Sequence, residues 1–225
     1  AASRAGISFN DFASATQVSS RVMGLSGAAA AENAAKMGHF AAQIGLVPSV
    51  VVGAMSSVVP AIAAMGKGVG KEMRELARIN KATGIEMQRL IAIGDQFDTF
   101  EGSAKAVGSL NAMLGGDFVN AIDLMMAKSP SERFMMLKDS LDAAGKSFDT
   151  MTYYERKAIA GALGFSNVGE LAMMMKGNFD ALSGTATMGT AEWEKYYEQQ
   201  QQLKTIKEEL TSVVARLAPD FVKFI

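Results

Sequence analysis

The chain has no cysteine, a single histidine and only four prolines among its 225 residues. Without cysteine there is no disulfide framework and no thiolate metal site. His39 stands alone in an apolar stretch, so a packed or solvated imidazole is a simpler interpretation than a ligand or a base. The scarcity of alternating runs of Val, Ile and Thr argues against a β-sheet protein. A formal net charge of −1 argues against bulk electrostatic binding of nucleic acid.

The side-chain combinations with which most enzymes work are also missing. The sequence has no His-Glu-x-x-His and no Gly-x-Ser-x-Gly motif. Candidates for metal or glycosidase chemistry are limited to the carboxylate pairs Asp95/Asp98, Asp139/Asp142 and Glu208/Glu209. These pairs fall at helix starts or on polar helix faces, where capping or solvation explains them. We therefore predict that the chain is not an enzyme and has no metal or cofactor site.

The most distinctive stretch that is present is residues 37–66, which lack Asp, Glu, Lys and Arg and are closed by Lys36 and Lys67. The uncharged core of this stretch is about as long as the ~20 residues that cross a bilayer. Pro48 and Pro60 must kink or interrupt a helix here. Burial in an assembly and entry into a membrane both remain open.

Small residues recur at every fourth position of this segment. On a helix such positions form a ridge that lets a second backbone approach closely, in a bilayer or in water. We predict a close-packing row formed by Ala41, Gly45, Ser49, Gly53, Ser57 and Ala61.

The chain divides into four parts by composition. Residues 1–36 are an Ala-rich lead, of which 1–27 are expected to be loosely helical or extended. Residues 37–70 are the uncharged hydrophobic segment with a Gly-rich joint. Residues 71–182 are a helical cluster, and residues 183–225 are a linker followed by an amphipathic helix. The chain begins without Met, which suggests a piece of a longer or processed polypeptide.

Charged, helix-periodic sequence begins at Lys71, and Thr83-Gly84 supplies a helix stop before a short helix at residues 85–93. This helix–turn–helix pattern is also typical of DNA-reading proteins. Its second helix, however, offers only Gln88 and Arg89 to bases or phosphates. A structural helical hairpin is favoured, and a helical DNA-binding regulator is kept as an alternative.

Helix-capping motifs recur along residues 95–177. Ser129-Pro-Ser-Glu132 and Thr152-Tyr-Tyr-Glu155 read as capping boxes, and Asn167-Val-Gly-Glu170 approximates one. Glycines at positions 115, 116, 164 and 177 are expected to end the intervening helices. The fold class predicted is therefore all-α: a series of short helices with Gly or Pro breaks, either packed or extended inside an assembly.

A weak two-fold internal repeat lies in this region. Phe97-Asp-Thr99 recurs as Phe148-Asp-Thr150, and the sequence at 114–126 is echoed 49 residues later at 163–175. We interpret the pair as two copies of one helical unit.

The longest uninterrupted helix is expected between Ala191 and Ala218, before Pro219. Its apolar residues step by three and four, as in a coiled coil, with Leu in one row and β-branched residues in the other. This pattern leans towards three or more copies, although packing on the same chain remains open. The predicted oligomer seam consists of Tyr196, Leu203, Ile206, Leu210, Val213 and Leu217.

A resemblance adds to this interpretation. Three stretches of the sequence resemble the tape measure (tail-length) proteins of large tailed bacteriophages. They are Gln96-Phe-Asp-Thr-Phe-Glu-Gly-Ser-Ala-Lys-Ala-Val-Gly-Ser-Leu-Asn-Ala-Met-Leu-Gly-Gly116, then Ser131-Glu-Arg-Phe, and then residues 145–164. The similarity is greatest to marine and cyanobacterial contractile-tailed phages and covers a little over a third of the chain.

The resemblance implies a virion protein inside the tail tube that sets tail length and leaves ahead of the DNA. It further implies several copies in contact with tail hub and tail tube proteins, assembly in the host cytoplasm, and contact of the apolar segment with the host membrane during ejection. A membrane-inserting, pore-forming ejection protein is the main alternative. Because a ruler needs long continuous helix and this chain is often interrupted, we expect an end region of such a protein.

Overall fold

The computed structural model describes residues 7–179, which contain ten α-helices and one 3-10 helix and no strand. The all-α prediction is confirmed for these residues. They belong to one compact unit, Ala1–Leu182. The predicted oligomer seam at residues 196–217, the linker and the C-terminal amphipathic helix lie outside the described residues.

The chain begins with three helices that pack on one another: α1 (Phe9–Met23), α2 (Gly27–Gln43) and α3 (Pro48–Ala61). Side-chain caps start the first two, because Ser8 accepts from the Asp11 N–H at 3.1 Å and Ser26 accepts from the Ala29 N–H at 3.4 Å. The lead is therefore more regular than expected: α1 is a 15-residue helix packed on both α2 and α3.

The uncharged segment 37–66 is divided between elements. It forms the end of α2, a turn at residues 44–47, α3, and most of the 3-10 helix η2 (Ala63–Gly68). Pro48 occupies the first turn of α3 and Pro60 its last turn, so the prolines mark the ends of one helix. The fully buried side chains of α3 are Val51, Val52, Met55, Val58 and Val59. Within residues 7–179, no helix combines the length and the hydropathy that crossing a bilayer requires.

The charged hairpin follows as α4 (Val69–Thr83) and α5 (Met87–Asp95). Gly84 ends α4 in the left-handed conformation, and its N–H donates to the Asn80 carbonyl at 2.7 Å. This φ of +79° is costly for any residue with a Cβ, which explains the Thr-Gly stop. The second helix begins two residues later than the sequence suggested.

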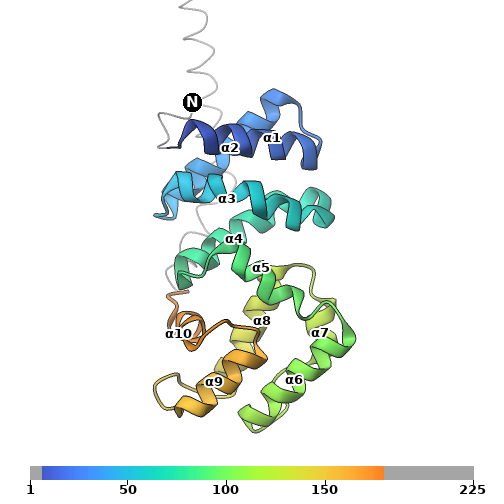
Figure 1. The fold of residues 1–225 in the computed structure, drawn as a ribbon, viewed down its shortest axis with the longest axis vertical. Helices are drawn as coiled ribbons and strands as arrows, with labels where there is room; N and C mark the ends of the chain where they lie inside the picture. The colour runs from blue at the N-terminus through green and yellow to red at the C-terminus, as the bar shows by residue number, and fades with distance from the viewer. Residues whose placement is uncertain (1–6, 180–225) are drawn as a thin grey trace, which may run out of the picture. The chain divides into compact units, whose positions relative to one another are not determined.

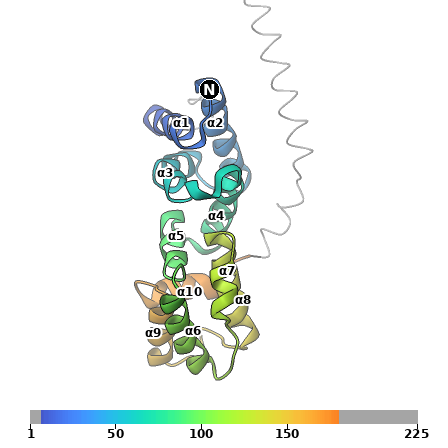
Figure 2. The same ribbon diagram turned by 90° about the vertical axis from the view of Figure 1, so that its right-hand side faces the viewer.

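Five further helices complete the unit: α6 (Phe100–Leu114), α7 (Ala121–Met126), α8 (Pro130–Ala143), α9 (Tyr153–Ala162) and α10 (Val168–Lys176). α6 packs against both α7 and α9, and α8 packs against α5. In both views α6 lies beside α9 (Figures 1 and 2).

The expected caps start α8, α9 and α10, with one refinement. The Thr152 and Glu155 pair forms a complete capping box at α9. At α8 and α10 the cap side chains of Ser129 and Asn167 accept as expected. The glutamate of each cap, however, accepts from the N–H one residue before the cap: Glu132 from Lys128, and Glu170 from Ser166. These two sites are therefore not capping boxes in the strict sense.

The two halves of the internal echo have a shared order of elements: a helix, a left-handed glycine (Gly115 or Gly164), and an Asn-capped helix. Beyond these glycines, the alignment of the two halves differs from the 49-residue offset expected from the sequence. The caps Asn120 and Asn167, and the buried Leu124 and Leu171, correspond at an offset of 47 residues. Two extra residues between Gly115 and Asn120 cause the slip. Common origin of the halves stays a prediction.

Candidate functional site

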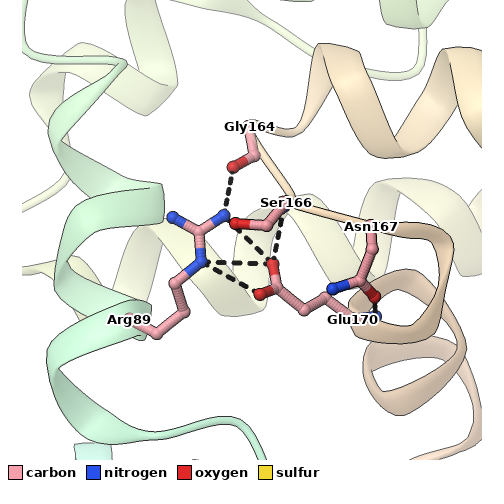
Figure 3. Close-up of polar contacts among 5 residues, drawn as sticks. All are labelled: Arg89, Gly164, Ser166, Asn167 and Glu170. Carbon is pink, nitrogen blue, oxygen red and sulfur yellow. Dashed lines mark hydrogen bonds and ion pairs between the residues drawn. The ribbon is translucent and has the colours of Figure 1, made fainter.

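Within residues 7–179, the most connected polar cluster joins α5 to the turn between α9 and α10 (Figure 3). The Arg89 guanidinium reaches Glu170 through Nε, at 3.1 and 3.2 Å from the two carboxylate oxygens, and through Nη2, at 3.0 Å from Oε2. Nη2 also donates to the Gly164 carbonyl at 2.6 Å. The side chains are 28% and 16% exposed, so the pair is only partly solvated. Such multidentate, charge-assisted contacts are among the stronger polar interactions.

Local structure prepares both halves of this cluster. Gly164 adopts a left-handed conformation after α9, which turns the chain toward α10. Asn167 caps α10 by accepting from the Glu170 N–H at 3.1 Å, and Glu170 Oε2 accepts from the Ser166 N–H at 3.0 Å. These local hydrogen bonds orient the Glu170 carboxylate independently of its contact with Arg89. The arrangement holds no nucleophile or proton relay, and its chemistry is that of a structural tie.

The position of Arg89 bears on the DNA-reading alternative. Arg89 was one of two side chains that the second helix could offer to a duplex, and its guanidinium faces Glu170 and Gly164. Gln88 is exposed. DNA contact by Arg89 would require the guanidinium to leave this cluster.

A second arginine ties three helices together around one of the candidate carboxylate pairs. Arg133 Nε donates to the Leu124 carbonyl at 2.9 Å and Nη1 donates to the Gly94 carbonyl at 3.0 Å. The same guanidinium forms an ion pair with Asp98. Burial and then the nearby Asp98 charge raise the pKa of Asp95, while Arg133 opposes that shift.

Asp139 and Asp142 do not assemble into a centre. Asp142 forms an i, i+4 ion pair with Lys138 at 2.5 Å. Glu208 and Glu209 lie outside the described residues. In the part of the chain that the structure describes, no group of three or more His, Asp or Glu side chains could hold a metal ion.

Sequence reasoning missed one buried carboxylate. Glu72 of α4 is 3% exposed, and it accepts from the Ser131 N–H at 2.8 Å and from Ser131 Oγ at 2.7 Å. It therefore meets the N-terminus of α8, where unpaired N–H groups and the helix dipole favour a negative charge. A signal was present: Glu72 falls in the apolar row of Val69, Met73 and Leu76.

The predicted close-packing row is split between two helices. Ala41 is buried in α2 and Gly45 lies in the turn, while Ser49, Gly53, Ser57 and Ala61 lie in α3. The row is not one continuous ridge, because the chain turns at Gly45. Gly53 approaches α1 of the same chain: an ideal Cβ there would lie 3.1 Å from Asp11 Oδ1.

A cleft of about 490 Å³ lies between α6 and α9. Small side chains from both helices line it, together with Met113, the single cation Lys105 and Gln96, whose buried Nε2 has no hydrogen-bond partner. Its small residues are Gly102, Ala106, Ser109, Ala158, Gly161 and Ala162. The cleft could accept an apolar or acidic group from another molecule.

Comparisons with known proteins leave the family open. No family model, no curated protein and no solved structure matches the chain.

Proposed function

We propose that the chain is a structural virion protein: a segment of a tail tape measure protein, housed in the tail tube and hub of a phage. In this proposal it helps to set tail length and is released during genome ejection. The observation that carries the proposal is the sequence resemblance of residues 95–177. That stretch contains α6 to α10, and Arg89 of α5 and Arg133 of α8 link it to α5.

The proposal assigns an end region rather than the ruler to this chain. The longest of the described helices, α2, has 17 residues and therefore extends only about 25 Å at ~1.5 Å per residue. A measuring segment of a long tail needs a much longer helix. We propose that several copies contact tail hub and tube proteins in the virion, after assembly in the host cytoplasm.

Mass spectrometry of purified tails, taken before and after triggered DNA ejection, tests this role. We expect peptides from residues 7–179 in intact tails and their loss from emptied tails. The tail tube protein, which stays in place, is the matched control. Absence of the chain from intact tails contradicts the proposal, and retention after ejection contradicts the release step.

A membrane-active ejection protein is the second candidate. The observation that favours it is an exposed apolar corner where α3 begins: Val47 and Val50 are 59% and 58% exposed. Together with the uncharged segment behind it, this corner offers an apolar surface to a bilayer.

Dye release from anionic vesicles by the full chain tests the second candidate. We expect leakage from the unmodified chain and a several-fold reduction for the double variant Val47→Asp/Val50→Asp. The matched control is Ser56→Asp on exposed α3 surface. No leakage at high protein-to-lipid ratio excludes this candidate and leaves the tail role untouched. Titration of duplex DNA with the full chain at low salt tests the DNA-binding regulator alternative. A flat binding curve contradicts that alternative.

A further inference from the structure

α6, which lines the small-residue cleft together with α9, also packs against α7, and α7 carries an exposed apolar ridge. Ile122 and Met126 are 61% and 75% exposed, and they stand one helical turn apart. Leu124, on the opposite side of α7, is 1% exposed and belongs to the core. α7 is thus anchored by one side and presents two large apolar side chains on the other.

The cleft has the complementary shape. Gly102, Ala106 and Ser109 follow one face of α6 at helical spacing, and Ala158, Gly161 and Ala162 follow one face of α9. Small side chains on two neighbouring helices leave a groove into which a third helix can bring its side chains. At Gly161, an added Cβ would meet nothing within 4 Å, so the groove is open there.

The charges of the two surfaces are complementary as well. Lys105 is the charged residue that lines the cleft, and it is exposed. Asp123 is exposed and follows Ile122 on α7, on the same half of the helix as the ridge and away from Leu124. A helix that places Ile122 and Met126 in the groove carries Asp123 toward Lys105.

We propose that a second copy of this chain occupies the cleft, with α7 of each copy inserting Ile122 and Met126 between α6 and α9 of the other. α6 packs against both α7 and α9, so the helix that carries the ridge and the cleft both adjoin α6. Reciprocal insertion of this kind requires a two-fold axis between the copies, as in an isologous dimer. The inference does not depend on a role in phage tails.

Cross-linking between differently tagged full chains tests this contact, and the absence of native cysteine makes the test clean. One chain carries Ala106→Cys in the groove and the other carries Met126→Cys on the ridge. We expect a mixed disulfide at least tenfold above that of a control pair, Lys71→Cys with Met126→Cys. Association through any other surface raises both pairs alike, so the control separates this contact from a C-terminal seam.

Charge reversal then tests the register. Lys105→Asp on the groove chain should lower the cross-link several-fold, and adding Asp123→Lys to the ridge chain should restore it. Gly161→Leu, at a position where an added Cβ meets nothing within 4 Å, should fill the groove and abolish the cross-link while the far-ultraviolet circular dichroism stays unchanged. A mixed disulfide no stronger than the control overturns the proposal. So does a signal insensitive to both Gly161→Leu and charge reversal.

Discussion

Arg89 shows how one side chain joins distant parts of the chain. It contacts Glu170, 81 residues away in sequence, and the carbonyl that follows α9. Removal of the guanidinium leaves a carboxylate that is only 16% exposed beside a carbonyl that has lost its donor. The cost of a partly buried, broken pair exceeds the small net value of a solvated one.

We expect Arg89→Met to lower the free energy of unfolding by about 2 kcal/mol. Glu170→Gln should cost less, because the amide oxygen can still accept from the Ser166 N–H. Urea denaturation of both single variants and the double variant gives the coupling energy, expected at about 1 kcal/mol. Lys176→Met, which removes the exposed Lys176–Asp149 pair, is the control and should change stability by less than about 0.5 kcal/mol. A coupling energy near zero contradicts the structural tie.

Asp95 is a residue whose charge opposes folding. It lies at the last position of α5, where the helix dipole disfavours an anion, and burial and Asp98 raise its pKa. A carboxyl whose pKa is raised by folding contributes most at pH values below its unfolded pKa. That contribution is lost as the pH rises through the folded pKa.

Asp95→Asn should therefore stabilise the protein at pH 7, by about 0.5 kcal/mol. The gain should shrink as the pH falls through the raised folded pKa, and it should be gone below the ordinary carboxyl pKa of 3.8. Chemical denaturation across this range checks both statements. Asp139→Asn, at an exposed position of α8, controls for the loss of one negative charge. A gain that is independent of pH would show that the charge of Asp95 is not the cause.

At the scale of elements, the helices of residues 100–176 depend on their N-caps. In α9, Thr152 Oγ1 accepts from the Glu155 N–H at 3.2 Å, and Glu155 Oε2 accepts from the Thr152 N–H at 2.8 Å. Hydrogen bonds from the Thr152 backbone and side chain, and then Lys146, lower the pKa of Glu155. This stabilisation is present above the unfolded carboxyl pKa and is lost as the pH falls through the lower folded pKa.

Thr152→Ala should destabilise the protein by about 1 kcal/mol at pH 7, and Thr152→Ser should be nearly neutral. The penalty should decrease in acid. Protonation of Glu155 there removes the part of the stability that comes from the lowered pKa of this carboxyl. Thermal or urea unfolding at pH 7 and pH 3 measures both effects. Thr150→Ala, just before the cap and exposed, is the control. An equal penalty for alanine and serine would show that the hydroxyl is not what matters.

For the whole molecule, copy number is the open quantity of the tail proposal. The predicted seam of Tyr196, Leu203, Ile206, Leu210, Val213 and Leu217 is a pattern in sequence, and it leans towards three or more copies. Sedimentation equilibrium of the full chain should therefore detect trimers or larger species. Leu203→Asp/Leu210→Asp should reduce them, while Lys204→Asp in the same stretch should not. A monomer at high concentration contradicts the seam, unless the tail hub is needed as a template.

Local features were the ones that sequence predicted best. Thr152, Ser129 and Asn167 start helices, and Gly84 and Gly164 end them, because a cap or a left-handed turn involves residues three to five positions apart. The 49-residue register of the internal echo matches the left-handed glycines Gly115 and Gly164, but it does not match the caps Asn120 and Asn167, which lie 47 residues apart.

Partners distant in sequence were beyond such reasoning. Nothing near Glu170 indicates Arg89, and nothing near Glu72 indicates Ser131, which is 59 residues away. The Ala41 to Ala61 row could be recognised, but its partner could not, since a small side chain accepts many neighbours.

The sequence by itself determined the all-helical class of residues 7–179, the starts of α8, α9 and α10, several glycine helix ends, and the need to shield an uncharged stretch from water. These properties follow from backbone propensity, caps and apolar periodicity, which act over a few residues. Only the tertiary structure decided that α1 packs over that stretch, that a turn divides it, and that Arg89, Arg133 and Glu72 join helices far apart in the chain. Those contacts depend on which helix faces meet, and that is settled by packing among all the helices at once.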